Sequence, residues 1–285
     1  MLEYNELNVG IRDVQMIQLE ILLEFDRICR KNNIKYQLFA GTLLGAVRHK
    51  GFIPWDDDID VCLLRDDYEK FLDVCLRDLD PRFFLQTYET DEKCIIQFAK
   101  IRKNDTIFIE ESTADCEIHQ GIFIDVFPLD NILPNTLRGV LHQKLLHIVG
   151  RINLCRIKRV CLEANKPAKR HLGLVCHYVL KVIPKAWTDR LQNRIIQAFS
   201  DHNAAHVSHL TLIASKDWIE RHTVEKSGFY DCIECEFEGH KFPIPHNYDE
   251  ILTRIYGNYM ELPPYEERKP HHGIIEISLD TCSKR

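Results

Sequence analysis

The sequence lacks an apolar segment long enough to cross a membrane. The apolar run at residues 172–182 contains Cys176, His177 and Lys181, and it falls short of the roughly eighteen residues that a spanning helix needs. A secretory signal is also missing, because the first predicted helix carries charged side chains where a signal would be uninterruptedly apolar. We therefore expect a cytosolic protein whose membrane contact, if any, is peripheral at the inner face.

A complete zinc-binding pattern is absent as well. The eleven cysteines are dispersed among otherwise apolar positions, which is typical of reduced thiols in a protein core. Cys232 and Cys235 form a C-x-x-C pair with His240 and His246 downstream, but no second pair completes a familiar zinc spacing. Two strand cysteines are therefore favoured over a zinc site. Internal repeats and low-complexity tracts are also missing.

Acidic residues are scarce in the middle of the chain, although the whole carries a net charge of -6. Between residues 138 and 194 there are thirteen Lys or Arg and only two acidic residues, Glu163 and Asp189. This asymmetry indicates an anionic partner, such as a lipid-linked glycan or the inner membrane leaflet. The alternative is a charged helical face that balances the acidic remainder. Nucleic acid is not expected, because few aromatic residues interleave with the basic ones.

The pattern of apolar residues predicts an α+β fold. Residues 11–29 place apolar side chains at three- and four-residue spacing, which predicts an amphipathic helix. A short strand, a tight turn at Gly41 and a short helix follow, and later β-rich runs predict a mixed sheet flanked by helices. From about residue 137 to 209 the chain is predicted to be mostly helical, with breaks at Pro167 and Pro184.

Three segments are predicted along the chain. Residues 1–136 form a catalytic core, and residues 211–285 supply strands and a helix that complete the same catalytic unit. Residues 137–210 form an additional, basic helical region. Because this region carries the excess of positive charge, we expect it to face the acceptor or a membrane.

The stretch from residue 41 to residue 60 begins with a pattern suited to phosphate. Glycines at a strand-to-helix turn let backbone N–H groups approach a phosphate closely, and the start of the helix adds a favourable dipole. Basic side chains after the turn would offset the charge of a donor's phosphates. The residues that we predict to bind the donor here are Gly41, Thr42, Gly45, Arg48 and His49.

Two aspartates near the end of this stretch are candidate metal ligands. Asp58 and Asp60 are two residues apart, so on a strand both carboxylates project from one face and can share Mg²⁺ or Mn²⁺. The alternative is a solvated acidic loop. Ile59 and Val61 argue against it, because they indicate that the opposite face is buried. The pattern therefore predicts a metal site.

Asp125 is the candidate for a third carboxylate. It lies in an otherwise apolar strand, where a lone charge is costly unless it meets a metal or a cation. We predict that it ligates the metal, accepts the proton of an attacking hydroxyl, or does both. The alternative is a buried aspartate that caps a turn or pairs with an arginine. Asp130, nearer the end of the strand, is expected to be a cap.

Further charged residues are predicted near these aspartates. Lys100 and Arg102 share one face of a predicted strand, and we predict that they bind phosphate or carboxylate groups. A structural ion pair is the alternative for both. Glu110 and Glu111 are expected either on the acceptor side of the site or as surface charges.

These motifs resemble those of the LicD family. The resemblance covers most of the chain except the basic middle. Where the family often has an aspartate in a Tyr-Gly-x-Tyr-Met motif, this chain has Asn258, at what is expected to be a helix-end turn. The segments that carry the resemblance are residues 41–49, 54–61, 100–102, 121–130 and 242–264.

The resemblance implies a nucleotidyltransferase-type fold and a transferase. The implied reaction moves phosphocholine, or another phospho-alcohol such as phosphoribitol, from a CDP-linked donor to a cell-surface glycan or its lipid-linked precursor and releases CMP. Lipopolysaccharide and teichoic acid are glycans of this kind. The implied metal ligands are Asp58, Asp60 and Asp125. An alternative reaction on the same fold is attack on the α-phosphate of a nucleoside triphosphate with release of pyrophosphate.

Overall fold

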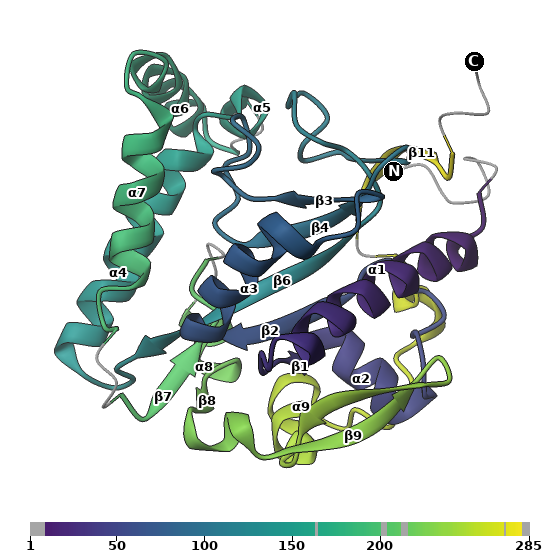
Figure 1. Ribbon diagram of the computed structural model, residues 1–285. Coiled ribbons are helices and arrows are strands. Elements are labelled where there is room, and N and C mark those ends of the chain that lie inside the picture. The colour runs from purple at the N-terminus through teal and green to yellow at the C-terminus, as the bar shows by residue number, and fades with distance from the viewer. Residues whose placement is uncertain (1–8, 163–164, 201–203, 212–215, 271, 281–285) are drawn as a thin grey trace.

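A mixed β-sheet forms the centre of the protein, as expected for an α+β fold. The computed structural model describes residues 9–162, 165–200, 204–211, 216–270 and 272–280 (Figure 1). The strand order is β1-β2-β6-β4-β3, and the long strand β6 continues into pairing with β7, which pairs with β8. Strands β2 and β6 are parallel, whereas the other neighbours are antiparallel. The strands are β1 (Gln37–Leu38), β2 (Asp60–Leu64), β3 (Phe83–Gln86), β4 (Ala99–Lys103), β6 (Phe123–Ile132), β7 (His206–Ser208) and β8 (Val224–Glu225).

One face of the sheet is covered by two helices, α1 (Ile11–Lys31) and α3 (Arg65–Asp78) (Figure 1). The predicted opening helix is thereby confirmed. Apolar side chains that recur every three or four residues between Val14 and Cys29 are buried, and Phe25 contacts the ring of Phe71 at 4.9 Å between centroids. Each such buried side chain contributes about 1.5–3 kcal/mol to folding.

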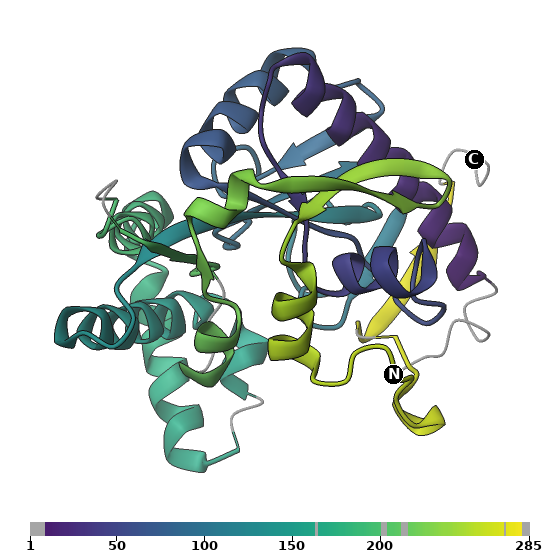
Figure 2. The same ribbon diagram turned by 90° about the horizontal axis from the view of Figure 1, so that it is seen from below.

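Helix α2 (Ala40–His49) begins one residue earlier than the predicted glycine turn. Ala40 takes a left-handed backbone conformation with φ of 43°, so the chain turns there and Gly41 already lies inside the helix. The hairpin of β9 (Cys232–Phe237) and β10 (His240–Pro245) packs against α2 and β1, and α9 (Tyr248–Tyr256) lies beside α2 (Figures 1 and 2). The C-terminal third of the chain therefore supports the segment that carries the aspartates.

Four helices form the basic region beside the sheet (Figure 2). Pro167 is the first residue of α6 and Pro184 directly precedes α7, so both predicted breaks are confirmed. The prediction of helix to about residue 209 is wrong at its end, because β7 pairs there with the extension of β6. The helices are α4 (Leu137–Leu154), α5 (Lys158–Leu162), α6 (Pro167–Leu180) and α7 (Lys185–Ile196).

The remaining elements are short. Strand β5 (Ile107–Glu110) pairs with β11 (Ile274–Ser278), which brings residues near the C-terminus back to the first half of the chain. Helix α8 (Lys216–Arg221) follows β7, and the 3₁₀ turns are η2 (Ser227–Tyr230) and η3 (Tyr265–Glu267). Of the helices in the described parts of the chain, none combines the length and the hydropathy of a membrane-spanning segment.

Candidate active site

The register of three strands places Asp60, Asp125 and Lys100 in one row across the sheet. Asp60 at the start of β2 is paired with Asp125 on the parallel strand β6. Asp125 is paired in turn with Lys100 on the antiparallel strand β4. Residues far apart in sequence thus meet because the sheet aligns them. We refer to Asp60, Asp125 and Lys100 as the carboxylate row.

An ion pair joins Lys100 and Asp125, with 2.9 Å between Nζ and Oδ1. Both side chains are buried. Burial raises the pKa of Asp125 above its ordinary value, and the charge of Lys100 partly opposes that rise. Lys100 also lies 3.9 Å from Glu110. The cationic partner of Asp125 is therefore this lysine rather than an arginine.

Two further carboxylates, those of Asp56 and Asp58, lie close to the carboxylate row in the loop before β2. Burial raises the pKa of Asp56 to about 9, and the charge of Asp58 together with a hydrogen bond to it adds to the rise. Burial, and then the charges of Asp58 and Asp125, also raise the pKa of Asp60. A Cβ atom at Gly41 would lie 2.9 Å from Oδ2 of Asp56, so glycine permits this carboxylate to approach the start of α2.

His272 links the acidic loop to strand β5. Its Nδ1 lies 3.1 Å from Oδ1 of Asp57, and its Nε2 lies 3.6 Å from Oε1 of Glu110. Burial tends to lower the pKa of His272, but the hydrogen bond to Asp57 and the charges of Asp58 and Glu110 raise it to about 9. Sequence reasoning missed this residue, because nothing in the local pattern connects it with a loop 215 positions away.

The carboxylate row, Asp58, Glu110 and His272 line one cavity with a volume of about 560 Å³. That volume lies within the range of small-molecule sites. One end of the cavity is polar and the other is aromatic, and three side chains from the basic helical region, Leu154, Ile157 and Val160, complete its wall. The charged and titratable side chains of the polar lining include Asp58, Asp60, Lys93, Lys100, Glu110, Asp125 and His272.

Two of the predicted phosphate-binding residues of α2, Thr42 and Gly45, make contacts with other parts of the protein. The Oγ1 atom of Thr42 accepts a hydrogen bond of 2.8 Å from the backbone N–H of Asp60. A Cβ at Gly45 would lie 2.5 Å from the carbonyl oxygen of Gly51, so this glycine permits close backbone packing. Neither residue lines the cavity.

The basic side chains predicted to bind phosphate divide into two groups. Arg48 donates to the carbonyl oxygens of Tyr259 and Glu261 at 2.7 and 3.2 Å, and its Nε lies 3.0 Å from Nε2 of His49. Arg102 is fully buried and donates to the carbonyl oxygen of Gly121 at 2.7 Å. The structure thus brings Lys100 to the cavity but places Arg48, His49 and Arg102 outside its lining.

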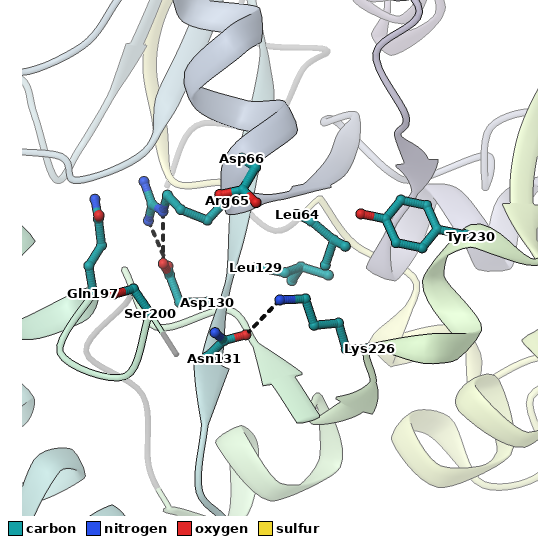
Figure 3. Close-up of a pocket in the computed structure, with 10 residues that line it drawn as sticks. All are labelled: Leu64, Arg65, Asp66, Leu129, Asp130, Asn131, Gln197, Ser200, Lys226 and Tyr230. Atoms are coloured by element: carbon teal, nitrogen blue, oxygen red, sulfur yellow. Dashed lines mark hydrogen bonds and ion pairs between the residues drawn. The ribbon is translucent and has the colours of Figure 1, made fainter. Parts of the chain in front are cut away.

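A second cavity lies at the opposite end of β2 and β6 (Figure 3). Arg65 forms a bidentate ion pair with Asp130 there, at 2.7 and 2.6 Å, and Lys226 donates to Asn131 at 3.3 Å. Asp130 is therefore half of a buried ion pair, and the expectation that it caps a turn is wrong. The guanidinium group pairs with the buried carboxylate of Asp130, whereas the other carboxylate drawn in Figure 3, that of Asp66, is exposed, so this cavity differs from the carboxylate row.

The residues of the first cavity suit a hard divalent cation, although no ready-made centre is present. Within the described ranges, no group of three or more His, Cys, Asp or Glu side chains has the arrangement of a metal site. Asp58, Asp60 and Asp125 nevertheless line the same cavity, and their oxygen donors are the ligands that Mg²⁺ and Mn²⁺ prefer. Burial and the repulsion of neighbouring carboxylates raise the pKa of Asp60, and a bound cation would relieve that repulsion. The metal site stays a prediction.

Comparison with known proteins identifies the class of enzyme. Residues 33–139, which carry the carboxylate row, match the family model described as LicD/FKTN/FKRP, nucleotidyltransferase domain. The lipopolysaccharide cholinephosphotransferase LicD of Haemophilus influenzae is 32% identical over 270 residues, which are 92% of this chain and 96% of the relative. The protein is therefore a phosphotransferase. It belongs to the LicD family.

Two further relatives match only part of the chain. An uncharacterized protein of Rickettsia typhi is 35% identical over 118 residues, or 41% of this chain and 36% of that protein. An uncharacterized protein of Rickettsia prowazekii is 41% identical over 64 residues, which are 22% of each chain. These two relatives share a limited stretch, whereas the Haemophilus protein also matches across the basic helical region.

Proposed function

We propose that this protein transfers phosphocholine from CDP-choline to a hydroxyl group of lipopolysaccharide or its lipid-linked precursor and releases CMP. The observation that carries this proposal is the 32% identity to the Haemophilus cholinephosphotransferase across 92% of the chain. The cavity supports it, because its lining combines several carboxylates that could hold a metal with the cationic side chains Lys93 and Lys100, and phosphoryl transfer is promoted by metal ions and positive groups.

In the proposed reaction, an oxygen of the acceptor attacks the phosphorus that carries choline. The bond from that phosphorus to the bridging oxygen breaks, and CMP leaves with the electron pair. Asp58 and Asp60, with Asp125 as a third ligand, would hold Mg²⁺ or Mn²⁺, which when bound would neutralise charge on the donor diphosphate. Asp125 is also the candidate to accept the proton of the attacking hydroxyl, since its raised pKa makes it a stronger base than an ordinary aspartate.

A product assay with the purified full chain tests this function. We expect Mg²⁺-dependent release of CMP from CDP-choline when lipopolysaccharide that lacks phosphocholine is supplied as acceptor, with radiolabel from choline appearing on the glycan. A panel of other CDP-alcohols and of nucleoside triphosphates serves as the control. Pyrophosphate from a triphosphate, in place of CMP, would contradict the proposal and assign the alternative nucleotidyltransferase reaction.

The basic helical region is proposed to rest on an anionic bilayer, which would bring a lipid-linked acceptor to the cavity. Helix α4 exposes apolar side chains at spacings of four, four, three and four residues, which forms one stripe. Exposed basic residues such as Lys144 and Arg151 flank the stripe, so the surface complements anionic lipid. The members of the stripe are Leu137, Leu141, Leu145, Ile148 and Ile152.

Vesicle flotation tests this contact. We expect the full chain to float with vesicles that contain phosphatidylglycerol and to stay unbound with vesicles of phosphatidylcholine alone, because the attraction includes the basic side chains. Leu141→Glu combined with Leu145→Glu should abolish flotation by placing charge in the stripe. Leu76→Glu, at a 66% exposed leucine of α3, is the matched control and should not alter it. Flotation that ignores anionic lipid content would contradict the proposal.

A further inference from the structure

The aromatic end of the cavity contains five rings that are connected to one another by ring contacts. Phe127 lies between Phe98 and His209, with ring-centroid distances of 4.7 and 4.1 Å. Phe39 adds a ring 5.9 Å from Phe127. Trp218 adds a ring 5.8 Å from His209. All five rings line the cavity, and we call them the aromatic cluster.

The sheet places this cluster one step along the strands from the carboxylate row. On β6, Phe127 follows Asp125 by two residues, so both side chains project from the same face. Beside it, Phe98 precedes Lys100 by two residues and both line the cavity. Two residues of strand span about 7 Å, which is comparable with the length of a phosphocholine group. A ligand with its phosphate at the carboxylate row would therefore reach the aromatic cluster with its alcohol.

The cluster consists of aromatic rings, and only its histidine and its tryptophan carry N–H groups; the ring of Trp218 is also stacked on that of His222, with 3.9 Å between centroids. Phe39, Phe98 and Phe127 belong to a packed apolar group. Each keeps a small accessible fraction of its side chain, 8% for Phe39 and Phe98 and 6% for Phe127. Burial, with a smaller effect of the neighbouring His222, lowers the pKa of His209 to about 3, so its ring is neutral. A cation at this end would meet no charged histidine of the cluster.

We propose that the aromatic cluster binds the trimethylammonium group of the donor and thereby selects choline among the CDP-alcohols. The inference rests on the proposed function and assigns the side chains that bind the choline end of the donor. A quaternary ammonium carries no N–H group and is attracted to the faces of tryptophan and phenylalanine rings. A polyol such as ribitol would instead leave hydroxyl groups without hydrogen-bond partners against these rings.

Two donor substrates with the same shape but different charge test whether the positive charge of choline contributes to recognition. The CDP ester of 3,3-dimethylbutanol has the shape of CDP-choline, but a neutral carbon replaces the ammonium nitrogen. For the wild-type protein we expect kcat/KM with CDP-choline to exceed that with the neutral donor by about 10-fold, which lies within the range of cation–π interactions. Phosphocholine should also inhibit more strongly than 3,3-dimethylbutyl phosphate, a comparison that needs no variant protein.

Substitutions in the cluster then test which residues cause the preference. Trp218→Leu and Phe98→Leu should each reduce kcat/KM for CDP-choline by about 3- to 5-fold, which is part of the wild-type preference, and change kcat/KM for the neutral donor by less than about 2-fold. Trp218→Phe keeps a ring and should retain most of the preference. Trp187→Leu, at a 68% exposed tryptophan of α7 outside the cavity lining, is the matched control and should behave as the wild type.

The outcomes distinguish this inference from the function on which it rests. Equal rates of the wild type with both donors, or equal losses with both donors in the leucine variants, would overturn the choline subsite and leave cholinephosphotransfer intact. Transfer from a CDP-polyol without transfer from CDP-choline would overturn both the subsite and the choline donor. Thermal unfolding of each variant shows whether a loss of activity reflects a loss of folding.

Discussion

Asp60→Asn is expected to lower CMP formation by about 10³-fold or more, which is the scale of losing one charge-stabilising group from a preorganised site. Asp60 begins β2, pairs in register with Asp125 and lines the cavity with Asp58. Asparagine keeps the shape of the side chain and its accepting oxygen but removes the charge that a divalent cation requires. The measurement is steady-state release of CMP from CDP-choline at saturating Mg²⁺.

The same variant should fold at least as stably as the wild type in the absence of metal. The pKa of Asp60 is raised, so the folded protein binds this proton more tightly than the unfolded chain does. Stability from this group is therefore present at low pH and is lost as the pH rises above the ordinary aspartate value near 4. Asparagine cannot ionise, and we expect its unfolding temperature at pH 7 to equal or exceed that of the wild type.

Metal linkage supplies an independent readout. Mg²⁺ should raise the unfolding temperature of the wild type, because a ligand that binds the folded state alone stabilises it. The shift should be absent or much smaller in Asp60→Asn. Asp66→Asn, at an exposed aspartate in the first turn of α3, is the control and should retain both activity and the shift. Activity above a tenth of the wild type in Asp60→Asn would refute the assigned role.

Arg65→Ala is expected to destabilise the fold by about 3–5 kcal/mol, because it leaves Asp130 buried without its partner. Asp130 is 2% exposed, and the bidentate guanidinium is its ion-pair partner (Figure 3). Chemical denaturation at pH 7 measures the change in the free energy of unfolding. The deficit should shrink at lower pH, because burial already raises the pKa of Asp130 and protonation removes the unpaired charge.

A double substitution shows whether the pair or the isolated charge determines this effect. Arg65→Met together with Asp130→Leu removes both charges and should recover most of the stability that Arg65→Ala loses. Lys31→Ala, which breaks an ion pair with Asp78 at the surface, is the comparison and should change stability little. A loss below about 1 kcal/mol in Arg65→Ala would mean that water or another group neutralises Asp130.

Several features of this protein follow from the sequence by itself. The spacing of apolar residues predicted α1, and the two prolines predicted the breaks before α6 and α7, because these signals act within a few turns of the chain. The alternation of Asp58 and Asp60 selected candidate ligands, and the motifs around them resembled the family to which the chain belongs. The C-terminal end of the helical stretch was misjudged, since β7 exists by pairing with β6.

Only the tertiary structure decided which groups meet. His272 contacts Asp57 because β11 returns to β5, and Lys100 meets Asp125 because β4 and β6 align in one register. The sequence could not separate Lys100 from Arg102, which share a strand face, yet one lines the cavity and the other is fully buried. The aromatic cluster likewise combines separate parts of the chain. Contacts between residues so far apart in the sequence depend on which strands pair and in which register, and the local spacing of residues does not determine either.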